Sequence, residues 1–203
     1  MKHRSYRSCA MERRTFLGMS LAGAGMLAAS NKANALKYYP KASDKKWALL
    51  YASWCGSSRD AAVWISEGMG GIADVFDVRE NPDLRQYDHV VVGSSIRMAK
   101  ISPEIKLYLE ANRSLLKSKI RGLFAVCGNL QQPPTQATVK LHITDQLEPL
   151  TGATGVPAHV FLGRVTPILL EPDLRKLLKS AGEYDNLKRF ECMAFGKEVF
   201  DKA

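Results

Sequence analysis

Residues 45–59 read Lys-Lys-Trp-Ala-Leu-Leu-Tyr-Ala-Ser-Trp-Cys-Gly-Ser-Ser-Arg, and they contain the most informative local pattern in the chain. Residues 47–52 form a short apolar run of the length expected for a buried strand. A small polar turn, residues 53–58, follows the run, and a helical pattern begins directly after the turn. A strand, a hydroxyl-rich turn with one glycine and a helix are the parts from which α/β proteins build an anion site.

The turn at residues 53–58 offers hydrogen-bond donors for one phosphate. The first amides of a helix have no intrahelical partners, and the helix dipole favours negative charge there. The hydroxyls of Ser53, Ser57 and Ser58 add donors, and Gly56 lets the backbone approach a phosphate closely. No Lys follows Gly56, so the turn is not a triphosphate loop, and the chain has no Gly-x-Gly-x-x-Gly motif. We therefore expect a single phosphate, bound by amides and hydroxyls rather than by Lys or Arg.

The same turn allows two other interpretations. Trp54-Cys55-Gly56 after an apolar strand is similar to the start of a thioredoxin active site, with Ser58 in place of the second cysteine. A cysteine at a helix N-terminus has a lowered pKa and can be reactive, which would give a monothiol thioredoxin-like protein that uses Cys55. The remaining alternative is a solvated turn that only caps a helix. The turn alone does not choose among these three.

The first 35 residues predict an export signal. Arg13-Arg14-Thr15-Phe16-Leu17-Gly18 precedes a mildly apolar run of small residues, and Ala33-Asn34-Ala35 supplies a small-x-small cleavage site. The apolar run is too short to span a bilayer as a helix. We interpret residues 1–35 as a twin-arginine signal peptide cleaved after Ala35, residues 36–44 as a tether, and residues 45–203 as one domain. The expected export partner is the twin-arginine translocase, and the expected location of the mature protein is the periplasm.

Much of the basic charge belongs to this leader. It holds six of the 29 Lys and Arg residues and one of the 20 Asp and Glu residues, so residues 36–203 carry a net charge of +4. A surplus of this size does not indicate nucleic-acid binding. The remaining cysteines, Cys55, Cys127 and Cys192, lack the spacing of metal or disulfide motifs. We expect no metal site, no disulfide framework and no transmembrane segment in the mature chain.

Strands alternate with helices along the rest of the chain. The sequence predicts strands at residues 47–52, 73–78, 89–93, 123–127 and 158–163, and helices at residues 59–70, 102–117, 135–147, 171–181 and 185–201. This alternation predicts a three-layer α/β fold, a doubly wound five-stranded parallel sheet of order 2-1-3-4-5. The most hydrophobic strand, 89–93, is expected at the centre and 73–78 at an edge. The ligand is then expected at the carboxyl ends of strands one and three, where turns 53–58, 94–99 and 128–132 converge.

With this arrangement, residues 45–203 resemble the flavodoxin-like FMN proteins. The greatest similarity is to the menaquinone-dependent protoporphyrinogen dehydrogenases and related small flavodoxins. Their phosphate loop, Ser-Thr-x-x-Gly-x-Thr, is matched by residues 52–58. Their third strand and loop read Val-Val-x-Gly-x-Ser-Ile-Arg, matched here by Val91, Val92, Gly93, Ser95, Ile96 and Arg97. Their fourth strand tends to end near Asn-Leu, as Asn129-Leu130 does here.

The resemblance implies an FMN cofactor and assigns residues to it. The phosphate would be held by Ser53, Trp54, Cys55, Gly56, Ser57 and Ser58. The isoalloxazine would be flanked by Ser95, Ile96, Arg97 and Met98 and by Gly128, Asn129 and Leu130. Electron-transfer flavodoxins usually stack the flavin between aromatic rings, and neither flanking loop has one here. Arg97 either stabilises an anionic reduced flavin or is solvated or paired with a carboxylate.

The predicted function is an exported FMN-binding redox protein that carries electrons to or from a quinone or a protein partner. Twin-arginine export carries folded proteins, often with a cofactor inserted in the cytoplasm, which agrees with FMN. A protoporphyrinogen IX dehydrogenase-like FMN enzyme is the second hypothesis, although haem synthesis is normally cytoplasmic. The monothiol thioredoxin-like protein is the third, and it lacks the cis-proline loop of that fold. A flavodoxin-like scaffold that has lost FMN and serves as a binding module is a further class.

Overall fold

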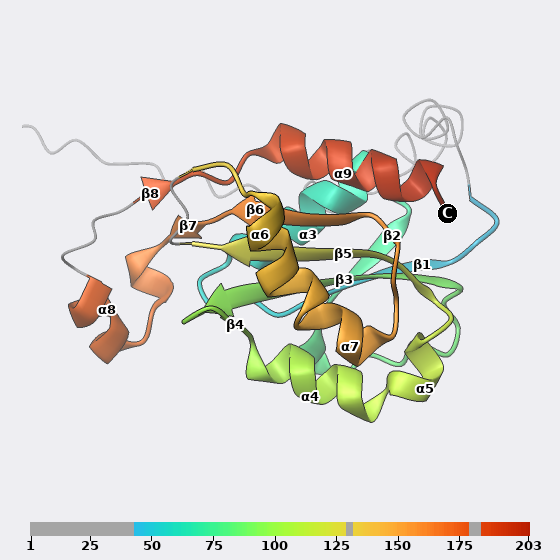
Figure 1. Cartoon of the computed structure of the whole chain (residues 1–203), viewed down its shortest axis with the longest axis horizontal. Helices are drawn as coiled ribbons and strands as arrows, with labels where there is room; N and C mark the ends of the chain where they lie inside the picture. The colour runs from blue at the N-terminus through green and yellow to red at the C-terminus, as the bar shows by residue number, and fades with distance from the viewer. Residues whose placement is uncertain (1–42, 129–131, 179–183) are drawn as a thin grey trace, which may run out of the picture. The chain divides into compact units, whose positions relative to one another are not determined.

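The computed structural model describes residues 43–128, 132–178 and 184–203 (Figure 1). The predicted signal peptide and most of the predicted tether lie outside these residues. Five parallel strands form one sheet in the order β2-β1-β3-β5-β6. They are β1 (Trp47–Tyr51), β2 (Ala73–Asp77), β3 (His89–Arg97), β5 (Ile120–Cys127) and β6 (Ala158–Leu162). Since β4 (Lys100–Ile101) only forms a hairpin with the end of β3, this is the predicted order 2-1-3-4-5, with β3 central and β2 at an edge.

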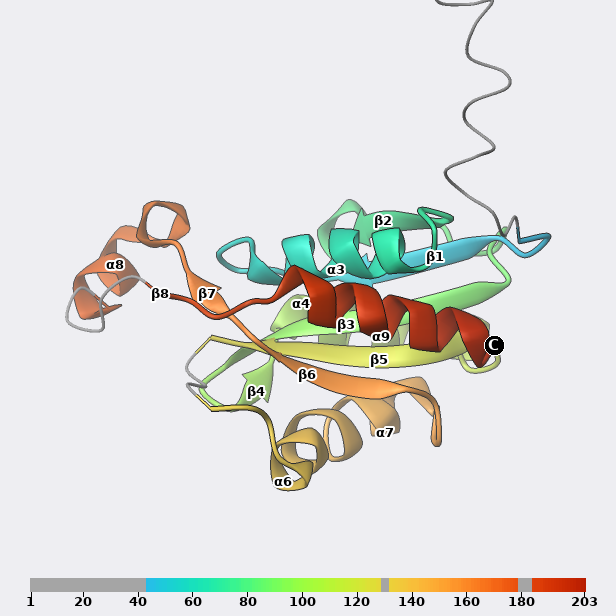
Figure 2. The same ribbon diagram turned by 90° about the horizontal axis from the view of Figure 1, so that it is seen from above.

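Helices cover both faces of the sheet (Figures 1 and 2). Alternate residues of each strand face opposite layers, so Leu49 packs with Ile65 and Phe195 in one core, and Leu50 packs with Ile105 in the other. The first core is closed by α3 (Ser57–Gly68) and α9 (Arg189–Asp201). The second is closed by α4 (Pro103–Ala111), α5 (Arg113–Leu116), α6 (Gln136–Val139), the π-helical turn η2 (Lys140–Thr144) and α7 (Leu147–Thr151).

Local sequence signals set several helix ends as predicted. Ser102 caps α4, because its Oγ accepts a hydrogen bond from the Ile105 amide at 3.2 Å, and Pro103 occupies the first turn. Two glycines with positive φ, Gly70 and Gly71, follow the end of α3.

Helices α3 and α9 lie side by side with their backbones in contact (Figure 2). A β-carbon on Gly68 of α3 would lie 2.1 Å from the carbonyl oxygen of Met193, and one on Gly196 of α9 would lie 2.1 Å from that of Ile65. Only glycine permits this approach at the two positions, and the contact fixes α3, whose N-terminus carries the polar turn.

Some predicted boundaries were wrong. Strand β3 continues four residues beyond the predicted end at Gly93, because its main chain pairs with β5 as far as Cys127. The predicted helix 135–147 is divided into α6, η2 and α7. Helix α7 extends beyond the predicted end to Thr151, and its Pro149 lies in the first turn, where a helix tolerates proline. The predicted helix 185–201 begins at Arg189, because Asp185 belongs to a short strand.

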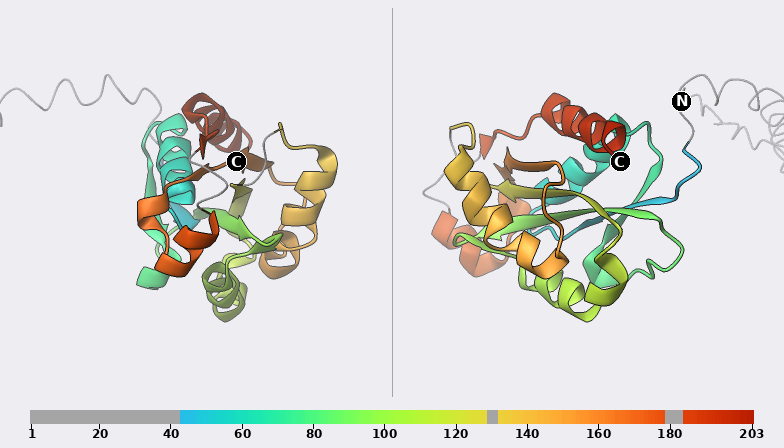
Figure 3. Two further views of the ribbon diagram at one scale, coloured as in Figure 1. Left: turned by 90° about the vertical axis from the view of Figure 1, so that its left-hand side faces the viewer. Right: turned by 45° about the vertical axis from the view of Figure 1, so that its right-hand side comes forward.

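A segment between β6 and α9 was not predicted in this form. It contains β7 (Arg164–Val165), the 3-10 turn η3 (Pro167–Leu169), α8 (Pro172–Leu178) and β8 (Tyr184–Asp185). Strands β7 and β8 pair antiparallel as a separate two-stranded sheet. The left panel of Figure 3 shows this segment, in orange, at the end of the molecule towards which β3 and β5 point.

The β3–β4 hairpin turns through two non-glycine residues with positive φ. Met98 has φ 49° and Ala99 has φ 62°, the sign that a two-residue type I′ turn requires at both positions. The side chain of Gln146 makes three hydrogen bonds, two of them to this hairpin and one to η2. Its Oε1 accepts from the Ile101 amide at 3.0 Å, and its Nε2 donates to the carbonyl oxygens of Ala99 and Leu141, both at 2.8 Å. These bonds offset the strain of the left-handed residues.

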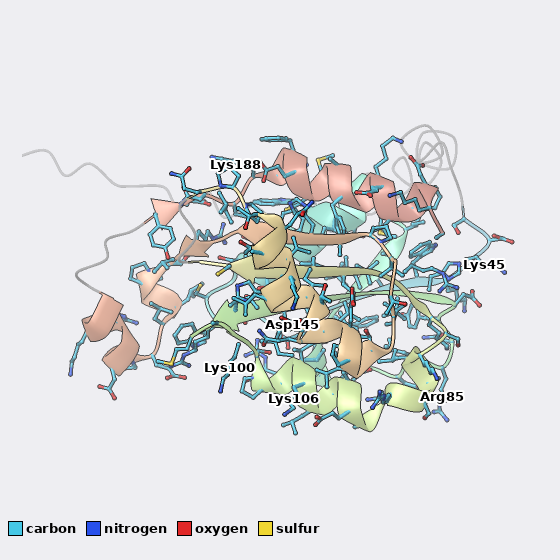
Figure 4. The ribbon with its side chains drawn as sticks, viewed as in Figure 1. Lys45, Arg85, Lys100, Lys106, Asp145 and Lys188 are labelled. Atoms are coloured by element: carbon cyan, nitrogen blue, oxygen red, sulfur yellow. The ribbon has the colours of Figure 1, made fainter. Side chains whose placement is uncertain are left out.

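We predict that Gln146→Ala loosens the hairpin. Loss of three hydrogen bonds should lower the free energy of unfolding by about 1–3 kcal/mol and speed hydrogen exchange at the Ile101 amide. Asp145→Ala, at the neighbouring residue labelled in Figure 4, is the matched control. The Asp145 carboxylate pairs only with the exposed Lys140 in the contacts described, so its loss should change stability by less than about 0.5 kcal/mol. Unchanged exchange at Ile101 in Gln146→Ala would contradict the prediction.

Candidate functional site

A cavity of about 280 Å³ opens where the carboxyl ends of β1, β3 and β5 meet. It brings together ten of the residues predicted from the sequence: Ser53, Trp54, Cys55, Ser57, Ser58, Ser95, Ile96, Arg97, Met98 and Gly128. Gly56 lies at the N-cap of α3 without lining the cavity. Asn129 and Leu130 lie outside the described residues. Residues of the first two predicted turns and Gly128 of the third therefore converge, and their binding of a ligand stays a prediction.

Five further lining residues were missed by the sequence analysis: Val126, Arg164, Val165, Leu170 and Tyr184. All but Val126 come from the segment between β6 and α9, which closes one side of the cavity. No local motif marks these residues. The only available signal was that Arg164 follows a strand and so stands at the carboxyl edge of the sheet.

The polar turn has the geometry of an anion site. Gly56 adopts φ 89°, and its amide donates to Ser53 Oγ at 3.0 Å, which leaves the Ser53 hydrogen free to donate. The first amides of α3 point out of the helix end without intrahelical partners. The Ser58 hydroxyl is buried, with 1% of the residue exposed, and has no hydrogen-bond partner. Since buried hydroxyls almost always have a partner, the Ser58 hydroxyl is available to an acceptor in the cavity that the residue lines.

The Ser57 hydroxyl, expected as a phosphate donor, is bonded to the main chain of Arg164 in the structure. Its Oγ donates to the carbonyl oxygen of Arg164 at 2.9 Å and accepts from the Arg164 amide at 3.1 Å. The Cys55 thiol donates to the same carbonyl at 3.4 Å. We call this set of bonds between Ser57, Cys55 and the Arg164 main chain the clasp. It ties β7 to the polar turn across 107 positions of sequence.

The polar turn also has positive charge beside it. The Arg164 guanidinium forms an ion pair with Asp60 in the first turn of α3, and its Nε is buried without a partner. Arg164 Nη2 lies 3.7 Å from the position that a β-carbon on Gly56 would take, and Arg59 Nη2 lies 3.9 Å from it. The turn itself contains no cation, as the sequence indicates, but two neighbouring guanidinium groups supply charge.

Aromatic rings reach the cavity from outside the two flanking loops. The Arg97 guanidinium lies 3.9 Å from the ring centroid of Trp54, a cation–π contact at the rim, so Arg97 is paired with an aromatic ring rather than with a carboxylate. Tyr184 lines the cavity from β8. Burial raises the pKa of Tyr184, and the nearby Cys55 and Cys127 raise it further, so the phenol stays neutral at physiological pH.

Two further properties are established for the part of the chain that the structure describes. No group of three or more His, Cys, Asp or Glu side chains is placed there to hold a metal ion. Within those same residues, no helix has the length and apolar character needed to cross a membrane.

Solved structures show the same fold at low sequence identity. Flavodoxin 1 from Bacillus cereus is 17% identical with a TM-score of 0.51, covering 77% of this chain and 98% of that one. The Flv1 flavodiiron core from Synechocystis is 14% identical with a TM-score of 0.50, over 91% of this chain and 40% of that one. The rubredoxin oxygen:oxidoreductase from Desulfovibrio gigas is 13% identical with a TM-score of 0.50, over 92% of this chain and 48% of that one. The chain thus spans less than half the length of the last two proteins.

No protein with a curated description matches the chain. A family profile described as a flavodoxin domain matches residues 48–167, which is more than half of the chain. The match agrees with the sheet order and excludes the thioredoxin-like fold behind the monothiol hypothesis. The chain belongs to the flavodoxin domain family.

Proposed function

We propose that the protein binds FMN in this cavity and is an exported redox protein that exchanges electrons with a quinone or a protein partner. A flavin supplies the capacity to accept and release electrons. The observation that carries the proposal is the buried, unpartnered hydroxyl of Ser58 at the N-terminus of α3. It indicates an anionic acceptor at the point where a helix dipole and free amides also favour one.

The rest of the cavity suits a flat ligand with a phosphate. It lies between the ends of β1 and β3, the switch point at which α/β sheets of this kind bind nucleotides. Val126, Val165 and Leu170 supply apolar walls, and Trp54 and Tyr184 supply rings. On this proposal the residues of the polar turn bind the phosphate, and Ser95–Met98 and Gly128 lie along the ring system.

Export and the electron partner are further parts of the proposal. Periplasmic location is supported by Arg13-Arg14 and the small-x-small site ending at Ala35.

Protoporphyrinogen oxidation linked to menaquinone is the second candidate function. It is supported by the match at Ser95-Ile96-Arg97, because these residues line the cavity. Oxidation of added protoporphyrinogen by the FMN-loaded protein with a menaquinone analogue would favour it, and no turnover would leave the electron-carrier proposal.

The cofactor proposal predicts a visible flavin spectrum for the protein purified from the cytoplasm without residues 1–35. Ser58→Ala removes a hydrogen bond to a charged group and should weaken FMN about 10- to 150-fold in a fluorescence titration. Gly56→Val should abolish binding, because a β-branched residue cannot adopt φ 89° without strain.

Cys55→Ser is the matched control, since serine can still donate to the Arg164 carbonyl and should change FMN affinity little. A wild-type protein that stays colourless and does not respond to FMN contradicts the cofactor proposal. Loss of function in Cys55→Ser with normal flavin binding would instead indicate thiol chemistry.

The export proposal predicts that Arg13→Lys with Arg14→Lys traps the precursor in the cytoplasm, because the signal is read as an arginine pair. The measurement is cell fractionation followed by sequencing of the mature N-terminus, which should begin at Leu36. Normal export of the double variant, or a mature chain that still contains Met19, would show that residues 1–35 are not this signal.

A further inference from the structure

We propose that Arg164 is the charge partner of the bound phosphate and that Asp60 competes with the phosphate for it. The ion pair between Arg164 and Asp60 would then set how strongly the site prefers a phosphorylated flavin to riboflavin. This inference rests on the proposed FMN site and adds a residue that neither the motif nor the polar turn contains.

Two buried donors beside the turn, one on α3 and one on β7, lack a hydrogen-bond partner and could share one acceptor. Ser58 Oγ from α3 and Arg164 Nε from β7 are both buried, both donors, and both without a partner. The two residues line the same cavity. A phosphomonoester dianion has several acceptor oxygens and can accept from a hydroxyl and a guanidinium together, whereas a neutral carbonyl does not balance the charge of the guanidinium.

The position of Arg164 is fixed independently of its side chain. The clasp uses only the main chain of Arg164, through Ser57 Oγ and Cys55 Sγ. The guanidinium is therefore held within reach of the turn, with Nη2 3.7 Å from the β-carbon position of Gly56. A substitution of the side chain can remove the charge and leave the clasp intact.

The Arg164 guanidinium already has two carboxylate partners, Asp60 and, 4.0 Å from Nη1, Asp185, and Asp60 is the closer and the less exposed of the two. Its carboxylate binds Arg164 on one oxygen and Arg59 on the other. A dianion that enters beside Asp60 meets a like charge, so binding is favourable when Arg164 shifts its charge from the carboxylate to the phosphate. Arg164 is the more effective of the two cations, because its side chain is 21% exposed while that of Arg59 is 57% exposed and screened by water.

The test measures FMN and riboflavin affinities by flavin fluorescence in four variants. Arg164→Gln should weaken FMN about 10- to 100-fold and leave riboflavin unchanged, because riboflavin has no phosphate. Asp60→Asn should strengthen FMN about 3- to 10-fold, since the competitor of the phosphate is removed. The gain from Asp60→Asn should shrink when Arg164→Gln is also present.

Arg59→Gln is the matched control, with the same change of charge beside the same carboxylate, and should alter FMN affinity less than about threefold. Three results would overturn the inference: equal losses for FMN and riboflavin in Arg164→Gln, no gain in Asp60→Asn, or equal losses in Arg59→Gln and Arg164→Gln. Each of these leaves the FMN proposal standing, because the wild-type protein still binds flavin.

Inorganic phosphate separates the inference from a failure of the FMN proposal. Phosphate should raise the melting temperature of the wild-type protein, raise that of Asp60→Asn more, and raise that of Arg164→Gln least, because only the turn amides and Ser58 remain to bind it. If flavin does not bind but phosphate acts in this order, the anion site stands and the FMN proposal fails. If phosphate stabilises all variants equally or none, the role of Arg164 is refuted whatever the flavin result.

Discussion

The parallel pairing of β3 on both of its sides is the constraint on which the rest of the structure depends. Its main chain bonds to β1 along one edge and to β5 along the other, all running in the same direction. Parallel neighbours place every carboxyl end at one edge of the sheet. The turn after β1, the hairpin after β3 and Gly128 after β5 therefore meet around one cavity. Helices must cover both faces of such a sheet, and the N-terminus of α3 is directed at the cavity because α3 returns from the end of β1.

The clasp, the set of bonds between Ser57, Cys55 and the Arg164 main chain, determines which further side chains line the cavity. Ser57 binds both main-chain groups of Arg164 and so attaches the segment between β6 and α9 to the polar turn. This segment brings a cation, an apolar wall and a phenol, the last from Tyr184, to a turn that has hydroxyls, amides, a thiol and the Trp54 ring of its own. The flavodoxin scaffold thus fixes where the cavity lies, and the clasp adds the charge of Arg164 and the ring of Tyr184 to its wall.

Features with a local physical cause could be predicted from the sequence. The apolar run at residues 90–92 marks a strand buried on both faces, and Ser102 followed by Pro103 marks a helix start, so the sheet order and most helices follow from short-range patterns. Ten of the thirteen candidate site residues gather at the cavity for the same reason, because strand ends in a parallel sheet converge.

The remaining features depend on contacts between distant segments. β7 and β8 have two residues each and no pattern of their own, so nothing marked Tyr184, and Arg164 was marked only by its position after a strand. Nothing in the sequence indicated that the Ser57 hydroxyl is bonded to the main chain of Arg164, because the two residues are 107 positions apart. The left-handed turn at Met98 and Ala99 was unpredictable, since neither residue favours positive φ and the stabilising amide belongs to Gln146.

The long sequence separation of the clasp has a consequence for the order of folding. Bringing residue 57 to residue 164 closes a loop of more than a hundred residues, whose entropy must be offset by contacts made earlier. We expect the β1–α3 unit and the central strands to form first and the wall at β7 to close last. A molecule present in the cavity during this interval would be enclosed by the final step, so the closing of the cavity depends on one late, non-local contact.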